Sequence, residues 1–156
     1  MAGVEELVLE LEAGPIHHFQ DWPASHLEVG RTGVYTIWSS TAFLYVGMSY
    51  RDVSETSNPN AKGLFGRLAS HASGRRSGDQ FCIYICDRFV IPRLSPDELA
   101  ALERGERILD RLTRDYIRSN LRYRSVVTTT GGEARILETH VRLHGLPSFG
   151  RPIINP

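Results

Sequence analysis

The sequence predicts a small α/β domain in which a central, mainly antiparallel three-stranded sheet is flanked by helices. Residues 33–38 and 43–48 are rich in Val, Ile, Tyr, Trp and Phe and are separated by a short polar turn, which is typical of a β-hairpin. Residues 81–87 form an apolar run that is typical of a buried third strand. Segments whose apolar residues follow helical spacing lie on both sides of this run along the chain.

The chain is long enough for one domain and too short for two. It has 156 residues, which is enough to build one hydrophobic core. We divide it into an N-terminal acidic extension, residues 1–32, and a main domain, residues 33–156. No apolar run approaches the ~18 residues of a membrane span, and the acidic N-terminus lacks the layout of a signal peptide. We therefore expect a cytoplasmic protein without a membrane partner.

The formal charges balance to zero but are distributed unevenly. Residues 1–30 contain six acidic groups and no Lys or Arg. The remaining residues hold all 18 Lys and Arg against 12 Asp and Glu, so they carry a net charge of +6. A basic body of this kind is compatible with a nucleic-acid partner, although uneven solvation of the surface would produce the same counts.

The N-terminal half contains two further patterns. Residues 4–12 alternate apolar and acidic residues toward their end, which predicts an edge strand. In the hairpin, a pairing of Ile37 with Phe43 would place Tyr35 opposite Tyr45. One face of the hairpin would then be apolar, with Trp38 beside Leu44 on it, and the other face would present both tyrosines.

The segment after the hairpin combines a polar loop with a helix. Residues 49–63 are polar and are expected to form a loop that can contact a ligand. The apolar residues that follow have helical spacing, which places Arg67 and His71 one turn apart on one face. A basic turn at residues 73–78 ends this helix and includes Arg75 and Arg76.

The C-terminal half is predicted to be mostly helical. Ser95 is a suitable N-cap for a long helix that would end near Asn120. Residues 126–132 predict a loop, residues 133–144 a final helix, and residues 150–156 an extended tail. Six arginines of the long helix and its end fall in one arc, which could follow phosphates or form a solvated, ion-paired face: Arg104, Arg107, Arg111, Arg114, Arg118 and Arg122.

The order and spacing of these pieces resemble the GIY-YIG nuclease family over about residues 33–155. The tripeptides that name the family correspond to Gly33-Val34-Tyr35 and Tyr45-Val46-Gly47, with Val in place of Ile in both. The family's helix with an essential Arg corresponds to residues 66–68. Its helix with a metal-binding Glu corresponds to residues 134–138, and its terminal Asn to Asn155. The Arg-x-x-x-His spacing of Arg67 and His71 is most similar to the restriction-enzyme branch.

The resemblance implies a metal-dependent DNA endonuclease that hydrolyses phosphodiester bonds, with Mg²⁺ or Mn²⁺ as cofactor. Glu138 would bind the metal, and Arg67 would stabilise the charge that builds on the phosphate. The remaining members of the set would handle protons and hold the tail. Tyr35 would act as general base or orient the water, Tyr45 would hydrogen-bond the phosphate or the water, His71 would relay a proton, and Asn155 would anchor the tail.

For substrate binding, we expect Gly33 and Gly47 to let the backbone approach DNA. Lys62, Arg75 and Arg76 are the expected phosphate contacts, and Lys62 is also an alternative to His71 in the proton chemistry. The expected partner is DNA, bound by a homodimer on a palindromic site if the protein acts in restriction or genome defence.

The same residues are compatible with other interpretations. A structure-selective repair nuclease or a nuclease toxin would use the same residues, and a catalytically silent nucleic-acid-binding module would keep the basic surface. Taken singly, the site residues also have structural interpretations. Strand tyrosines commonly pack in a core, and Glu138 can pair with Arg142 one helical turn later.

Overall fold

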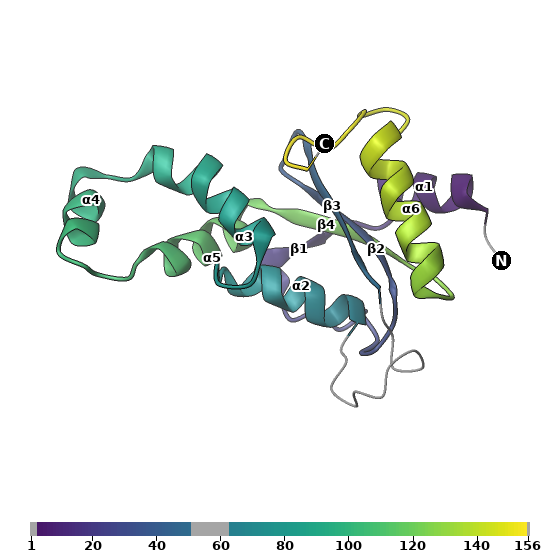
Figure 1. Ribbon diagram of the computed structural model, residues 1–156, viewed down its shortest axis with the longest axis horizontal. Helices are drawn as coiled ribbons and strands as arrows, with labels where there is room; N and C mark the ends of the chain where they lie inside the picture. Colours follow the sequence, from purple (N-terminus) through teal and green to yellow (C-terminus); the bar gives the residue numbers. More distant parts are fainter. Residues whose placement is uncertain (1–2, 51–62, 156) are drawn as a thin grey trace.

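The computed structural model describes residues 3–50 and 63–155, and these form a four-stranded antiparallel sheet with helices on both faces (Figure 1). The strands are β1 (His17–His18), β2 (Gly33–Trp38), β3 (Phe43–Ser49) and β4 (Arg122–Val127). Their order is β1-β4-β2-β3, so β3 is an edge strand. The predicted α/β class is confirmed. The predicted three-stranded sheet is wrong, because β4 includes residues assigned to a loop and β1 was not predicted.

Two layers of helices enclose the sheet. Helices α1 (Val4–Ala13) and α6 (Gly131–His144) cover one face, with Val8, Leu11, Leu137 and Val141 in its core. Helix α2 (Gly63–Ser73) covers the other face and packs on α5 (Leu109–Asn120). Within the described ranges, no helix is both long and apolar enough to cross a lipid bilayer.

Helix α3 (Gln80–Ile85) packs on α5 and buries Phe81, Cys82 and Ile85 in the core. From there the chain continues through the π-helical η2 (Cys86–Val90) and the 3₁₀ segment η3 (Ile91–Arg93) to α4 (Pro96–Glu103), which lies in an arm that projects from the body (Figure 1). A short 3₁₀ turn, η1 (Phe19–Asp21), lies between β1 and β2 in the chain and packs on α5.

The edge strand predicted at residues 4–12 is wrong, because these residues form helix α1. Val8 and Leu11 are buried three positions apart and Leu7 is half-buried beside them, which is the spacing of one helical face. Glu5 and Glu6 occupy the first turn, where carboxylates interact favourably with the helix dipole. The alternation was confined to the last few residues and did not decide the structure.

The third strand predicted at residues 81–87 is also wrong, because these residues lie in α3 and η2. Their buried members are Phe81, Cys82, Ile85 and Cys86, which follow helical rather than strand spacing. Asp79 caps the start of α3, and its side chain accepts a hydrogen bond from the Cys82 amide. A short apolar run fits a buried helix as well as a strand, so periodicity alone could not distinguish them.

The predicted long helix is divided into α4 and α5. Arg104 ends α4, and Gly105 follows with a positive φ of 86°, a conformation that favours glycine. The arginine arc is therefore not one continuous stripe. Arg118 donates to the carbonyl of Ala72, and Arg122 donates to the carbonyl of Ser39, so both contact the protein itself.

The hairpin is formed as predicted, but its register is not the predicted one. Tyr45 pairs with Ile37, and Tyr35 pairs with Gly47. The pairing shifts between Ile37 and Trp38, so that Leu44 is an extra residue in β3 and joins the opposite core cluster from Trp38. A shift of two residues leaves side chains on their original face. The Tyr35 and Tyr45 rings consequently still lie together, with centroids 6.4 Å apart.

Candidate active site

A chain of hydrogen bonds links the sheet to two helices. The hydroxyl of Tyr35, in β2, lies 2.7 Å from Nε2 of His71, in α2. The other ring nitrogen of His71, Nδ1, lies 2.7 Å from Oδ2 of Asp79, the residue that caps α3. All three side chains are buried, so these bonds are shielded from competing water.

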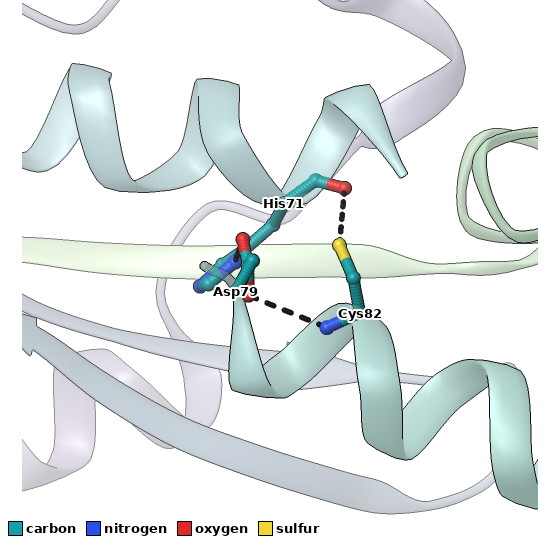
Figure 2. A group of neighbouring side chains, drawn as sticks. All are labelled: His71, Asp79 and Cys82. Carbon is teal, nitrogen blue, oxygen red and sulfur yellow. Dashed lines mark hydrogen bonds and ion pairs between the residues drawn. The ribbon is translucent and has the colours of Figure 1, made fainter. Parts of the chain in front are cut away.

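Asp79 is held in place by more than His71. Its Oδ2 also accepts a hydrogen bond of 2.7 Å from the Ser70 hydroxyl, and its Oδ1 accepts one of 3.3 Å from the Cys82 amide. Figure 2 shows Asp79 between His71 and the first turn of α3. Burial opposes ionisation, but the hydrogen bonds from His71, Ser70 and the Cys82 amide together lower the pKa of Asp79 to about 2. The carboxylate is therefore charged at neutral pH.

His71 is neutral at neutral pH. Burial lowers the pKa of His71 below its ordinary value of 6.5, although the Asp79 carboxylate acts in the opposite direction. A carboxylate can only accept hydrogen bonds, so Nδ1 carries the ring proton and donates a hydrogen bond to Asp79. Nε2 is then an acceptor, and the Tyr35 hydroxyl donates to it.

Arg67 places a permanent positive charge beside both tyrosines. It lies close to the Tyr35 hydroxyl, and its charge lowers the pKa of Tyr35 and of Tyr45. Burial has the larger effect in each case. It raises the pKa of Tyr35 and raises that of Tyr45 to about 12. Tyr35 is fully buried and Tyr45 half-buried, whereas Arg67 is exposed, so the site faces solvent on the Arg67 side.

Glu138 approaches from the opposite layer, on α6. Its side chain is only 14% exposed, and its Oε1 lies 3.3 Å from Nε of Arg142, the ion pair that helical spacing suggested. Burial nevertheless raises the pKa of Glu138, so Arg142 does not fully compensate for the lost hydration. The Glu138 charge also raises the pKa of Tyr45, which places the two residues within electrostatic reach across the edge strand.

The donor chemistry of Glu138 fits a Mg²⁺ ion. Mg²⁺ prefers oxygen ligands, keeps several waters and is commonly bound by one or two carboxylates together with substrate phosphates. A divalent cation would also add positive charge beside the Glu138 carboxylate, whose burial Arg142 does not fully compensate. Glu138 is therefore a suitable protein ligand for such an ion.

Asn155 fastens the C-terminal tail to the outer edge of β3. Its Oδ1 accepts a hydrogen bond of 3.1 Å from the Val46 amide, and its Nδ2 donates one of 2.6 Å to the Val46 carbonyl. The Ile154 amide donates to the Leu44 carbonyl at 2.8 Å, so the tail covers this part of the edge. Asn155 thus contacts the residue directly after Tyr45.

The two glycines of the tripeptides are buried, and their close neighbours are protein atoms. A Cβ at Gly47 would meet the Tyr35 hydroxyl, and one at Gly33 would meet the carbonyl of Val126. Gly47 therefore makes room for the Tyr35 side chain, whereas we had expected both glycines to make room for DNA.

Two of the expected phosphate-binding residues, Arg75 and Arg76, follow the C-terminal end of α2. Arg76 forms a bond of 2.7 Å with Oδ1 of Asp110, and Arg75 is exposed just beyond the end of α2. Lys62 lies outside the described residues.

His71, Asp79 and Cys82 also form a close group of potential metal ligands, with their donor atoms within 4.8 Å of one another (Figure 2). Both ring nitrogens of His71 are already hydrogen-bonded. Burial raises the pKa of the Cys82 thiol, and its Sγ lies 3.6 Å from the His71 carbonyl oxygen. A protonated thiol is a poor metal ligand. The group is therefore better described as a hydrogen-bonded cluster.

Asp79 is the site residue that sequence reasoning missed. It stands two residues before the apolar run that begins at Phe81, which is a suitable position for a helix N-cap. A strand at residues 81–87 would have no N-cap, so the strand prediction gave Asp79 no structural role. The helix that forms there instead makes Asp79 its N-cap, next to His71 of α2.

Comparison with known proteins found no matching family model, no matching curated protein and no matching solved structure. The fold and the site define an α/β protein with a buried Tyr–His–Asp hydrogen-bond chain and an arginine on its solvent side.

Proposed function

We propose that this protein is a metal-dependent endonuclease that hydrolyses DNA phosphodiester bonds. The observation that carries the proposal is the convergence of Tyr35, Tyr45, Arg67 and His71 from three elements of the fold, while α6, which carries Glu138, packs on β3 from the opposite layer. These are the residues that the resemblance to GIY-YIG nucleases selects, and they come from distant parts of the chain.

Arg67 and Tyr45 are suited to bind the reacting phosphate. Arg67 is always charged, and its planar fork of N–H groups matches phosphate oxygens. It is exposed and lies close to the buried Tyr35, so it connects the site with solvent. The half-buried Tyr45 hydroxyl beside it can donate to the phosphate or to the attacking water.

Tyr35 and His71 are suited to move the proton of that water. A free Tyr35 phenolate is disfavoured, because burial raises the pKa of Tyr35 more than Arg67 lowers it. Tyr35 can instead pass its own proton to the neutral Nε2 of His71 while it accepts a proton from the water. Tyr35 is fully buried, so DNA binding must open the site on its solvent-facing Arg67 side before water can reach Tyr35.

Glu138 would hold Mg²⁺ or Mn²⁺, which as a Lewis acid stabilises charge on the phosphate and on the leaving oxygen. The ion pair with Arg142 and the raised pKa of Glu138 suit this role, because the carboxylate is already oriented and only partly neutralised.

Within this activity we favour restriction or genome defence in the cytoplasm, because Arg67 and His71 are spaced as in the restriction branch. A homodimer would then cut a palindromic site and produce discrete fragments. A structure-selective repair nuclease would prefer branched or damaged DNA, and a toxin would produce a smear.

The experiment that tests the proposal is cleavage of plasmid DNA with Mg²⁺ or Mn²⁺. We expect cleavage by the wild-type protein, none with EDTA, and a loss of at least about 10²-fold in the variants Arg67→Ala and Glu138→Ala. Arg93→Ala and Glu103→Ala remove the same side chains from the projecting arm, and both should cut as the wild type does. Cleavage that survives EDTA or both site substitutions would contradict the proposal.

One observation favours a second candidate, a nucleic-acid-binding module without catalysis. Tyr35 is fully buried and bonded on the inside of the protein, as a purely structural tyrosine would be. This candidate predicts a gel shift with DNA, no metal-stimulated cleavage and an unchanged shift in Glu138→Ala.

A further inference from the structure

Asp79 is a buried charge that has no part in the proposed reaction as described above. Its side chain is 2% exposed, and the structure gives both of its oxygens hydrogen-bond donors: Nδ1 of His71, the hydroxyl of Ser70 and the amide of Cys82. A buried carboxylate is costly unless it is paired in this way. An N-cap needs only one of these bonds, so capping α3 does not account for the contact with His71.

The contact with Asp79 decides which nitrogen of His71 carries the proton. Oδ2 of Asp79 can only accept, so the neutral imidazole must be protonated on Nδ1, 2.7 Å away. Nε2 then presents a lone pair to the Tyr35 hydroxyl, also 2.7 Å away. With the proton on Nε2 instead, His71 would donate to Tyr35 and could not take its proton.

We propose that Asp79 is the positioning residue of this site, because it holds His71 in the tautomer that accepts the proton of Tyr35. The catalytic consequence rests on the proposed function, whereas the tautomer does not. The Tyr35 O–H bond breaks as an N–H bond forms at Nε2, and the Tyr35 oxygen takes a proton from water, leaving hydroxide to attack the phosphorus. Asp79 keeps its hydrogen bond to Nδ1 and stabilises the imidazolium that forms.

The variant Asp79→Asn separates positioning from capping. Asn is as good an N-cap as Asp, so the bond from the Cys82 amide to Oδ1 can remain. The side-chain NH₂ group of Asn then takes the place of Oδ2, and it can only donate hydrogen bonds. Nδ1 of His71 must therefore accept, which places the ring proton on Nε2. The matched control is Ser70→Ala, which removes a different hydrogen bond from the same Oδ2 and leaves the contact with His71 intact.

The test has two readouts on the full-length chain. Two-bond ¹H–¹⁵N spectra of histidine-labelled protein, with His71 assigned through His71→Gln, report the tautomer. We expect an Nδ1–H ring in the wild type and in Ser70→Ala, and an Nε2–H ring in Asp79→Asn. Plasmid cleavage as a function of pH reports the consequence. We expect Asp79→Asn to lower kcat by about 10²–10⁴-fold without weakening DNA binding, since proton transfer is typically worth that much. Ser70→Ala should stay within tenfold of the wild type.

Three results would overturn the inference. An Nε2–H ring in the wild type, or an unchanged tautomer in Asp79→Asn, would show that Asp79 does not set the tautomer. A changed tautomer with wild-type cleavage would show that the tautomer has no catalytic role. If the wild type cuts no DNA under any condition, the catalytic part falls together with the proposed function, and the spectra still decide the tautomer.

Discussion

The substitution Gly47→Ala tests how tightly the tyrosine site is packed. A Cβ built on Gly47 would lie 2.5 Å from Cζ and 2.9 Å from Cε2 of Tyr35, and closer still to its hydroxyl, whereas ordinary contacts begin near 3.4 Å. The Tyr35 side chain must therefore move by at least about 0.9 Å, the difference between 3.4 and 2.5 Å for Cζ, and further at the hydroxyl. A shift of this size is enough to break the 2.7 Å bond to His71.

The expected loss of stability follows from these two effects. Overpacking a core typically costs about 1–3 kcal/mol, and leaving a buried polar group unsatisfied costs about 1–3 kcal/mol. We expect Gly47→Ala to lower the free energy of unfolding by roughly 2–5 kcal/mol and to abolish metal-dependent cleavage. Urea unfolding followed by far-UV circular dichroism measures the first quantity, and the plasmid assay measures the second.

Gly132→Ala is the matched control for this substitution. Gly132 lies in the first turn of α6, and the nearest atom to an added Cβ would be the Thr130 hydroxyl oxygen at 3.6 Å. Because Ala is the better helix former, Gly132→Ala should be neutral or stabilising by about 0.5–1 kcal/mol. If both variants unfold at the same urea concentration, Tyr35 does not fill the space above Gly47, and our account of the site is wrong.

Two further predictions concern the surroundings of the site. The pKa of Asp79 falls from 3.8 to about 2 on folding. The ionised carboxylate therefore contributes on the order of 2 kcal/mol to the free energy of unfolding above pH 3.8, and this contribution is lost as the pH falls toward 2. The pKa of His71 is lowered from 6.5, so the unfolded chain binds this proton first and stability also falls as the pH drops below 6.5. Urea unfolding between pH 2 and pH 7 should show both effects, and a low-pH limb that is as steep in Asp79→Asn would contradict the first. Asn155→Ala removes two hydrogen bonds to Val46 and should lower the free energy of unfolding by about 1–3 kcal/mol. Hydrogen exchange at the Val46 amide should also become faster. An exchange rate unchanged from the wild type would show that Asn155 does not hold the tail on β3.

Local patterns in the sequence were sufficient for the hairpin and for α2. A run of β-branched and aromatic residues interrupted by a polar turn predicts paired strands, and apolar residues at helical spacing predict a helix. Those two elements carry Tyr35, Tyr45, Arg67 and His71. Strand and helix periodicity alone therefore indicated that both tyrosines lie on one face of the hairpin. They also indicated that Arg67 and His71 lie on one face of α2.

Local patterns failed where an apolar run was short. Residues 4–12 and 81–87 were predicted as strands and form α1, α3 and η2, because their partners decide which conformation buries them. The second error concealed Asp79, whose role depends on α3 beginning where it does. Strand β4, which carries Arg122 and Arg124, was also missed, since its apolar residues are too few to stand out.

The amino-acid sequence establishes which chemical groups are present and how they are spaced within each element. Which of these groups meet depends on the tertiary fold. The fold sets the hairpin register through the extra residue Leu44, brings Asp79 to His71, and packs Asn155 and the helix that carries Glu138 against β3. Such contacts join residues that are far apart in the chain. They form because burying two apolar faces of one sheet leaves few ways to arrange the helices, and no local pattern contains that constraint.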